Sequence, residues 1–109
     1  MSSKQSTVDF FVDQMSLAGD IRYRKMFGEY AIYCDNKVVG LVCNEKLYIK
    51  PTVAGERLID KIILEPPYPS AKPYFYISGD IAEDNIWLSQ LVRETAALLR
   101  LPKVKVIKK

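Results

Sequence analysis

Runs of β-branched and aromatic residues fill the middle of the chain and are interrupted by short polar pairs. The pairs are Asp35-Asn36 and Asn44-Glu45, and such residues tolerate the positive φ angles of two-residue hairpin turns. Around these pairs, the apolar runs predict strands at residues 29–34, 37–43 and 46–50. Because the connections are so short, neighbouring strands must run antiparallel, and the segment is predicted to be a three-stranded meander.

Apolar residues recur at helical spacing in three other parts of the chain. This spacing predicts an amphipathic helix around residues 8–15, a second helix at residues 52–64 and a third at residues 83–99. Trp87 lies beside the apolar face of the third helix and is predicted to anchor it. The terminal helices are therefore expected to cover one face of the sheet.

Two further strands complete the predicted sheet. Residues 21–25 alternate between polar and apolar side chains, as a half-buried strand does. The prolines within residues 65–73 exclude a helix or a central strand there, so this segment is predicted to be an ordered loop before a strand at residues 74–78. The predicted fold is α+β, an antiparallel sheet of about five strands with helices packed on it, in the order α-β-β-β-β-α-β-α.

Four groups of residues, spread over nearly the whole chain, resemble the TfoX/Sxy family and specifically its N-terminal domain. The groups are MFGEY at residues 26–30, LYIKPT at residues 47–52, AKPYFY at residues 71–76, and WL and LV at residues 87–88 and 91–92. The residues that we take as the structural motif of this resemblance are Phe27, Gly28, Lys50, Pro51 and Pro73.

The resemblance implies a regulatory role. Family members with two domains regulate bacterial competence for DNA uptake, and they carry a second, helical domain after the part that this chain resembles. We expect a stand-alone N-terminal domain at residues 1–102, a small regulatory or adaptor module that acts through protein contacts or as a homodimer. The family offers no catalytic residues that can be carried over, so we expect a protein that is not an enzyme.

Positive charge is concentrated at the C-terminal end. The chain has 16 Lys and Arg residues against 13 Asp and Glu, a net charge of +3, and its last seven residues hold four of the lysines. The rest is close to neutral, and residues 103–109 are predicted to be a flexible basic tail. Because such a tail contacts phosphates without reading sequence, a nucleic-acid-associated protein is the alternative function. The candidate phosphate contacts are Lys103, Lys105, Lys108 and Lys109.

The chain contains no histidine and two cysteines, which excludes Ser-His and Cys-His nucleophile pairs and the commonest zinc ligand. Cys34 and Cys43 lack the spacing of a metal site. Counting from the turn at residues 35–36 places Cys43 opposite Gly28 and about 20 Å from Cys34, too far for a disulfide. We expect reduced thiols, no metal and no cofactor.

Two carboxylates near predicted turns, Glu29 and Glu45, are the candidates for acid–base chemistry. Nothing in the sequence places them close to each other. An enzyme of unknown reaction is therefore a third hypothesis, without a residue that supports it.

Both faces of the predicted hairpin are apolar, so something must cover the face that the terminal helices leave free. Counting from the turn places Tyr33 and Val42 on this second face. Tyr68 and Tyr74 lie beside the proline-rich loop and form an aromatic wall for a ligand or a partner, with packing of the loop onto the core as the alternative. The candidate partner surface is Tyr33, Val42, Tyr68 and Tyr74.

The apolar runs are a few residues long, far short of the roughly 20 residues that cross a bilayer. The N-terminal sequence MSSKQSTVDF also lacks the apolar segment of a signal peptide. We therefore expect a cytoplasmic protein without a membrane partner.

Overall fold

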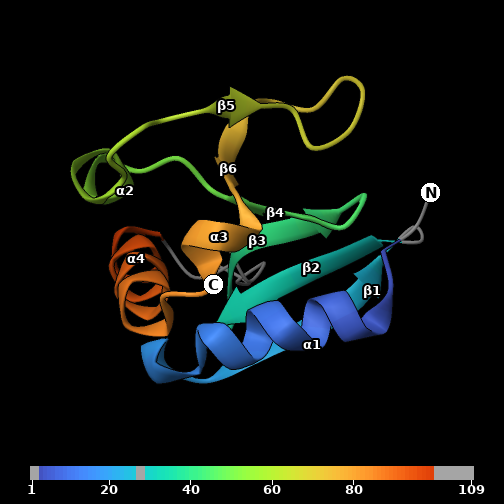
Figure 1. Ribbon diagram of the computed structural model, residues 1–109, viewed down its shortest axis with the longest axis horizontal. Helices are drawn as coiled ribbons and strands as arrows, with labels where there is room; N and C mark the ends of the chain where they lie inside the picture. Colours follow the sequence, from blue (N-terminus) through green and yellow to red (C-terminus); the bar gives the residue numbers. More distant parts are fainter. Residues whose placement is uncertain (1–2, 27–28, 100–109) are drawn as a thin grey trace, which may run out of the picture.

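Six antiparallel strands form one sheet in the computed structural model, which describes residues 3–26 and 29–99. The first four strands are neighbours in chain order, whereas the last strand lies between the fourth and the fifth (Figure 1). The spatial order is β1-β2-β3-β4-β6-β5. The strands are β1 (Ile21–Met26), β2 (Glu29–Cys34), β3 (Lys37–Cys43), β4 (Lys46–Ile49), β5 (Leu64–Glu65) and β6 (Tyr74–Ile77).

Helices α1 (Gln5–Gln14) and α4 (Asn85–Leu98) pack on one face of this sheet (Figure 1). Three shorter helical segments are η1 (Ser16–Ala18), α2 (Val53–Leu58) and α3 (Gly79–Ala82). The predicted α+β fold, with helices on an antiparallel sheet, is confirmed. The helices and the sheet share one core, which includes Val8, Phe11, Ile32, Val42, Leu47, Ile49, Phe75, Ile77, Leu88, Leu91 and Val92. Within the described residues, no helix has the length and the apolar character needed to cross a membrane.

The two predicted hairpin turns are present, and their backbone explains the choice of residues. Asp35 and Asn36 have φ angles of 52° and 70°, and Asn44 and Glu45 have φ angles of 53° and 65°. Two consecutive residues with positive φ match the right-handed twist of the strands that they join. These polar pairs therefore determine the β2–β3 and β3–β4 connections.

A β-bulge changes the register of the first hairpin. Cys34 faces Lys37, as predicted, but the pairing shifts between Ile32 and Tyr33, so that β3 contains one additional residue. Tyr30 consequently faces Val42, and the continued register brings Cys43 opposite Glu29. The prediction that Cys43 lies opposite Gly28 is therefore wrong by one residue.

The same bulge corrects the predicted position of Val42. Because side chains alternate along a strand, one additional residue moves every side chain beyond it to the other face. Val42 lies on the face that the helices cover and is fully buried in the core. Val42 is therefore not part of a partner surface, and Leu41 and Cys43 take the second face instead.

The second helix is shorter than its apolar spacing predicted. Thr52 is the N-cap of this helix, and its Oγ1 accepts a hydrogen bond of 3.1 Å from the backbone N–H of Gly55. The helix ends at Leu58, whose carbonyl accepts a hydrogen bond of 3.1 Å from Trp87 Nε1, and Ile59 is extended. Residues 60–63 are therefore not helical, and the predicted loop at residues 65–73 begins inside strand β5.

Several motif residues of the sequence lie at the ends of strands. Lys50 follows β4 and donates its backbone N–H to Val39 at 2.8 Å, and Pro51 leads into the second helix. Pro73 directly precedes β6. The other predicted features lie outside the described residues: Phe27, Gly28, the boundary at residue 102 and the lysines Lys103, Lys105, Lys108 and Lys109.

Candidate functional site

Among residues 3–26 and 29–99, no helix lies over β1 to β3 on the second face of the sheet, which carries a row of mixed side chains. Strand pairing aligns Arg24, Ala31, Leu41, Tyr48 and Tyr76 across five strands. Ala31, in the middle of this row, is fully buried. The far end of the face is built by β6, β5 and the loop at residues 66–73 (Figure 1).

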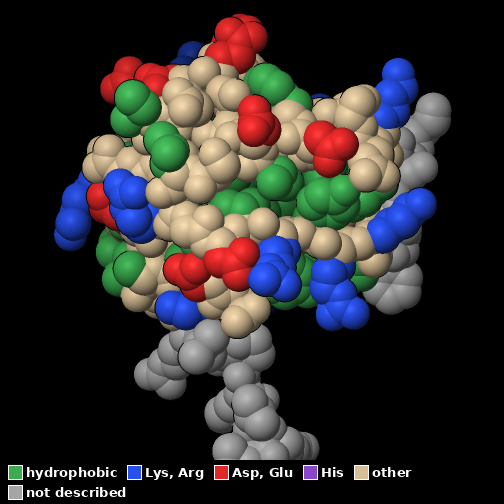
Figure 2. Space-filling model, turned by 90° about the horizontal axis from the view of Figure 1, so that it is seen from below, with side chains coloured by type: hydrophobic (Ala, Val, Ile, Leu, Met, Phe, Trp, Pro, Cys, Tyr) green, Lys and Arg blue, Asp and Glu red, His purple; other side chains and the backbone are tan. Residues whose placement is uncertain are grey.

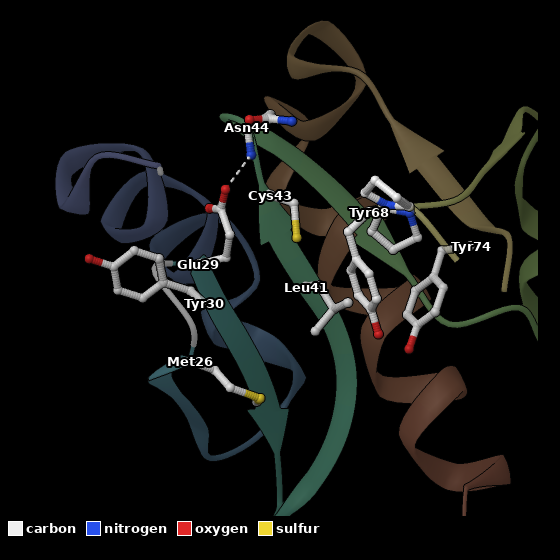
Figure 3. A pocket seen from close by; sticks show the side chains of 10 residues that line it. Met26, Glu29, Tyr30, Leu41, Cys43, Asn44, Tyr68 and Tyr74 are labelled. Carbon is white, nitrogen blue, oxygen red and sulfur yellow. Dashed lines mark hydrogen bonds between the residues drawn. The ribbon is translucent and has the colours of Figure 1, made fainter. Parts of the chain in front are cut away.

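A cavity of about 590 Å³ lies between the sheet and this loop. We call it the tyrosine cleft. Figure 3 shows the hairpin strands on one side and the rings of Tyr68 and Tyr74 on the other, with both hydroxyls turned the same way. Its volume is in the range of ordinary ligand sites. The residues that line it are Met26, Glu29, Tyr30, Leu41, Cys43, Asn44, Pro67, Tyr68, Pro69 and Tyr74.

The tyrosine wall is held by packing beneath it. Within the loop, Pro67 is buried, whereas Tyr68 is 55% exposed at the mouth of the cleft. Burial raises the pKa of Tyr74, and the nearby Tyr68 and Cys43 add to this increase. A further tyrosine, Tyr48, donates its hydroxyl to Glu65 at 3.1 Å, and burial together with this bond raises its pKa to about 12. The phenols of Tyr74 and Tyr48 are therefore neutral near pH 7.

The carboxylate of Glu29 forms the end of the cleft and accepts three hydrogen bonds. It accepts hydrogen bonds from the backbone N–H of Ser3 at 3.0 Å, from Ser3 Oγ at 2.7 Å and from the backbone N–H of Asn44 at 3.1 Å (Figure 3). These bonds attach the N-terminal segment to the β3–β4 turn. Glu29 therefore has a structural role in the wall of the cleft.

Glu45 has a similar role at the start of α1. It accepts hydrogen bonds from the backbone N–H of Lys4, at 2.8 Å, and from Thr7 Oγ1. The bonds from Thr7 and Lys4 lower the pKa of Glu45, because they favour the charged form. Glu45 thus joins the N-cap residue Lys4 and the first turn of α1 to the β3–β4 turn. The two carboxylates considered for acid–base chemistry both tie α1 to the sheet.

The two cysteines occupy opposite faces of the sheet and have different surroundings. Cys34 is in the core, and burial raises its pKa. Cys43 points into the cleft beside the tyrosines (Figure 3), where burial and then the charge of Glu29 raise its pKa to about 11. Both thiols are free, and Cys43 is protonated at neutral pH. The cleft therefore presents a neutral, weakly polar sulfur atom to a ligand.

We expect Cys43 to react with iodoacetamide about 100-fold more slowly in the native protein at pH 8 than in urea, because only the thiolate reacts. The native rate should rise about tenfold per pH unit up to pH 11. Mass spectrometry of the peptide that contains Cys43 measures both rates. Equal rates in the native and unfolded protein would contradict the raised pKa.

A family model of the TfoX N-terminal domain matches residues 13–98, which include every residue that lines the cleft. The chain belongs to this family. It is also 39% identical over 108 residues to an uncharacterized 12.7 kDa protein in the trpE 5' region of Spirochaeta aurantia. The alignment covers 99% of this chain and 93% of the relative. The resemblance inferred from the sequence motifs is therefore confirmed.

In this TfoX N-terminal domain, the structure brings together part of the predicted partner surface. Tyr68 and Tyr74 line the cleft together. Tyr33 lies half-buried on the same face of the sheet, opposite Arg22, but does not line the cleft. Val42 is in the core, as described above. Two of the four predicted residues therefore contribute to one site.

Sequence reasoning missed the opposite wall of the cleft, which Met26, Leu41 and Cys43 form. Counting from the turn places Leu41 and Cys43 on the other face, because the hydrophobic pattern does not reveal the bulge in β3. Met26 is apolar but exposed, which is a sign of a binding surface. Its exposure becomes known only once the strand pairing is known. In residues 3–26 and 29–99, no group of three or more acidic, Cys or His side chains is arranged to hold a metal ion.

Proposed function

We propose that this chain is a small regulatory or adaptor module that acts through contacts with another protein, and that the tyrosine cleft is its contact surface. The observation that carries the proposal is the position of Tyr68, a large aromatic side chain that is 55% exposed at the mouth of an apolar cleft. Tyrosines of this kind are the usual anchors of protein interfaces.

Exposed apolar side chains at the β5 edge and on the wall of the cleft support a protein partner. Ile62, Ile63 and Leu64 lead into β5 and are all exposed, and β5 is an edge strand. Met26 is exposed on the opposite wall. Several apolar side chains exposed close together are characteristic of a surface that binds a partner. The partner is a different protein or a second copy of this chain.

Membership of the family supports the regulatory part of the proposal. The chain resembles the N-terminal domain of regulators of competence for DNA uptake, and the family match extends over the whole cleft. A domain that passes on a regulatory signal needs a contact surface and does not need a reaction centre. We therefore place the regulatory contact in the cleft.

We expect Tyr68→Ser to weaken the association at least about tenfold, because truncation of a central aromatic anchor commonly costs that much affinity. The protein would carry a C-terminal tag, and the native and variant forms would be used to retain partners from cells of the source organism. Light scattering of the purified protein would measure self-association in parallel.

The matched control is Ile86→Ser, which removes an exposed apolar side chain in α4, on the helical side of the molecule. This variant should retain the partner as the native protein does. If Tyr68→Ser and Ile86→Ser behave alike, with the same circular dichroism as the native chain, then the cleft is not the contact surface.

A further inference from the structure

A carboxylate is the charged side chain among the described residues that line the tyrosine cleft. Glu29 lines the cleft, and no Lys or Arg of residues 3–26 and 29–99 does so. Its hydrogen bonds come from the backbone N–H groups of Ser3 and Asn44 and from the Ser3 hydroxyl, which are neutral donors. Hydrogen bonds from neutral donors leave the negative charge of a carboxylate in place. The charge that the cleft presents to a ligand is therefore negative.

This carboxylate can accept a further hydrogen bond. From the part of the chain that the structure describes, Glu29 accepts two bonds at Oε1 and one at Oε2. An ionised carboxylate has about four acceptor positions, shared evenly by its two oxygens. The remaining position is on Oε2, and the bonds from Ser3 and Asn44 fix the orientation of the side chain. An N–H group of a cationic ligand can therefore donate to an acceptor that is already oriented.

Aromatic rings lie across the cleft from this carboxylate. Figure 3 shows the Cys43 side chain between Glu29 and Tyr68, with the rings of Tyr68 and Tyr74 together on the far wall. Burial and then the charge of Glu29 raise the pKa of Cys43. Burial, and then Tyr68 and Cys43, raise the pKa of Tyr74. The carboxylate and the tyrosine rings therefore act on the same space around Cys43.

An arginine side chain matches this combination of groups. A cation is attracted by the negative face of an aromatic ring as well as by a carboxylate. The guanidinium group is planar, stacks on aromatic faces and is more weakly hydrated than an ammonium group, so it suits an apolar cleft better than lysine does. The cavity of about 590 Å³ is also larger than one arginine side chain. An apolar neighbour of the arginine therefore fits against Met26 and Leu41.

Cations elsewhere on the surface do not neutralise the cleft. Arg22 is paired with Asp20 at 3.2 Å. Lys46 Nζ lies 5.5 Å from the centroid of the Tyr76 ring, and neither Lys46 nor Arg24 lines the cleft. Figure 2, seen from the side of α1 and β1, shows Lys and Arg side chains mixed with Asp and Glu side chains. Positive charge is therefore spread over the outside, and a cationic ligand meets Glu29 inside the cleft.

We propose that the tyrosine cleft binds an arginine side chain of a partner protein, with the guanidinium group against Tyr68 and within hydrogen-bonding reach of Glu29. This inference rests on the proposed function and names the chemistry of the partner's anchor. In an extended segment, side chains two positions apart lie on the same side, roughly 6.6 Å from each other. The apolar neighbour that packs against Leu41 is therefore two positions from the arginine.

Fluorescence anisotropy with three seven-residue peptides, capped at both ends and carrying an uncharged label, tests the inference. The first has Arg at its fourth position, Leu at its second and sixth, and Ala elsewhere. The second has citrulline in place of Arg, which keeps the planar shape without the charge, and the third has Glu there. The first should bind about tenfold more tightly than the second, the combined range of a partly exposed ion pair and a cation–π contact. The third should bind most weakly.

Two variants test the two groups that the proposal assigns to the arginine. Glu29→Gln and Tyr68→Leu should each reduce the preference for Arg over citrulline about threefold, because one removes the charge and the other the ring. Glu56→Gln is the matched control, since Glu56 is an exposed carboxylate in α2 and does not line the cleft. It should keep the full preference. Tyr68→Leu decides the test if circular dichroism shows that Glu29→Gln, which also contacts Ser3, does not fold.

Equal affinity for the Arg and citrulline peptides, tighter binding of the Glu peptide, or no binding of any peptide would overturn the inference. A preference for Arg that persists unchanged in Tyr68→Leu would place the arginine outside the cleft and overturn it as well. The same holds if free N-acetylarginine amide competes as strongly as the peptide, because the cleft would then be a site for a small molecule. A partner that is lost in Tyr68→Ser while the Arg and citrulline peptides bind equally would leave the proposed function standing and remove only the arginine anchor.

Discussion

Phe75→Ala is expected to lower the free energy of unfolding by about 3–5 kcal/mol, the usual cost of removing a buried phenylalanine ring. Phe75 lies on β6, is 2% exposed and belongs to the core. Its ring also packs against Gly55 of α2, where a Cβ atom would lie 2.5 Å from Phe75 Cε2. The substitution therefore leaves a cavity between the sheet and α2. Urea denaturation followed by circular dichroism measures the change.

Phe10→Ala provides the comparison for this prediction. Phe10 lies on α1 and is 40% exposed, so the same chemical change there removes much less buried surface. Its expected cost is well below that of Phe75→Ala. If the two variants lose equal stability, then Phe75 does not stabilise the packing of β6 on the core. The residues that keep Tyr68 and Tyr74 in place must then lie elsewhere.

Gly40→Ala is expected to lower the free energy of unfolding by about 1–3 kcal/mol, the cost of overpacking a core. A Cβ atom at Gly40 would lie 2.3 Å from the carbonyl oxygen of Tyr48 on the neighbouring strand. Because that atom belongs to the backbone of a paired strand, it cannot move without a shift of β4 relative to β3. The expected cost is therefore near the upper end of the range.

Gly79→Ala is the control for Gly40→Ala. Apart from its chain neighbours and the backbone of its own helix, no atom lies within 4 Å of a Cβ placed at Gly79, which is the first residue of helix α3. Alanine there should leave the stability unchanged or raise it slightly, because it reduces the freedom of the unfolded chain. Thermal unfolding of both variants gives the comparison. Equal stability of the two variants would contradict the close approach of β3 and β4.

Local chemistry was sufficient to predict the hairpins from the sequence. The pairs at residues 35–36 and 44–45 accept positive φ, which the favoured two-residue hairpin turns require. The N-cap at Thr52 depends on equally local chemistry, because its side chain accepts a hydrogen bond from a backbone N–H three residues away. Features that depend on neighbours in the chain could therefore be read from the sequence.

The bulge in β3 could not be predicted in this way. A bulged residue and a regular one have the same composition, and the difference arises from pairing with β2. Tyr33 and Val42 were placed on one face for this reason, whereas Val42 belongs to the core. The same error hid Leu41 and Cys43 as cleft residues. A single unpaired residue therefore accounts for most of what was missed at the site.

The second helix shows a different limit of sequence reasoning. Ile62 and Ile63 continue the helical spacing, yet the helix ends at Leu58 because Trp87 binds the carbonyl of that residue and β6 pairs with the segment that follows. Both effects come from parts of the chain that are far away in sequence. Tertiary contacts thus override a local preference for helix.

The hydrogen bonds of Glu29 make the N-terminal segment and the cleft thermodynamically coupled. A ligand that moves the Glu29 carboxylate also breaks the two hydrogen bonds from Ser3, which lies immediately before α1. For such a ligand, reciprocity requires that a second ligand whose binding displaces residues 3–7 changes the affinity of the cleft by the same factor by which its own affinity is changed. The beginning of the chain is thus a second place from which occupancy of the cleft can be altered.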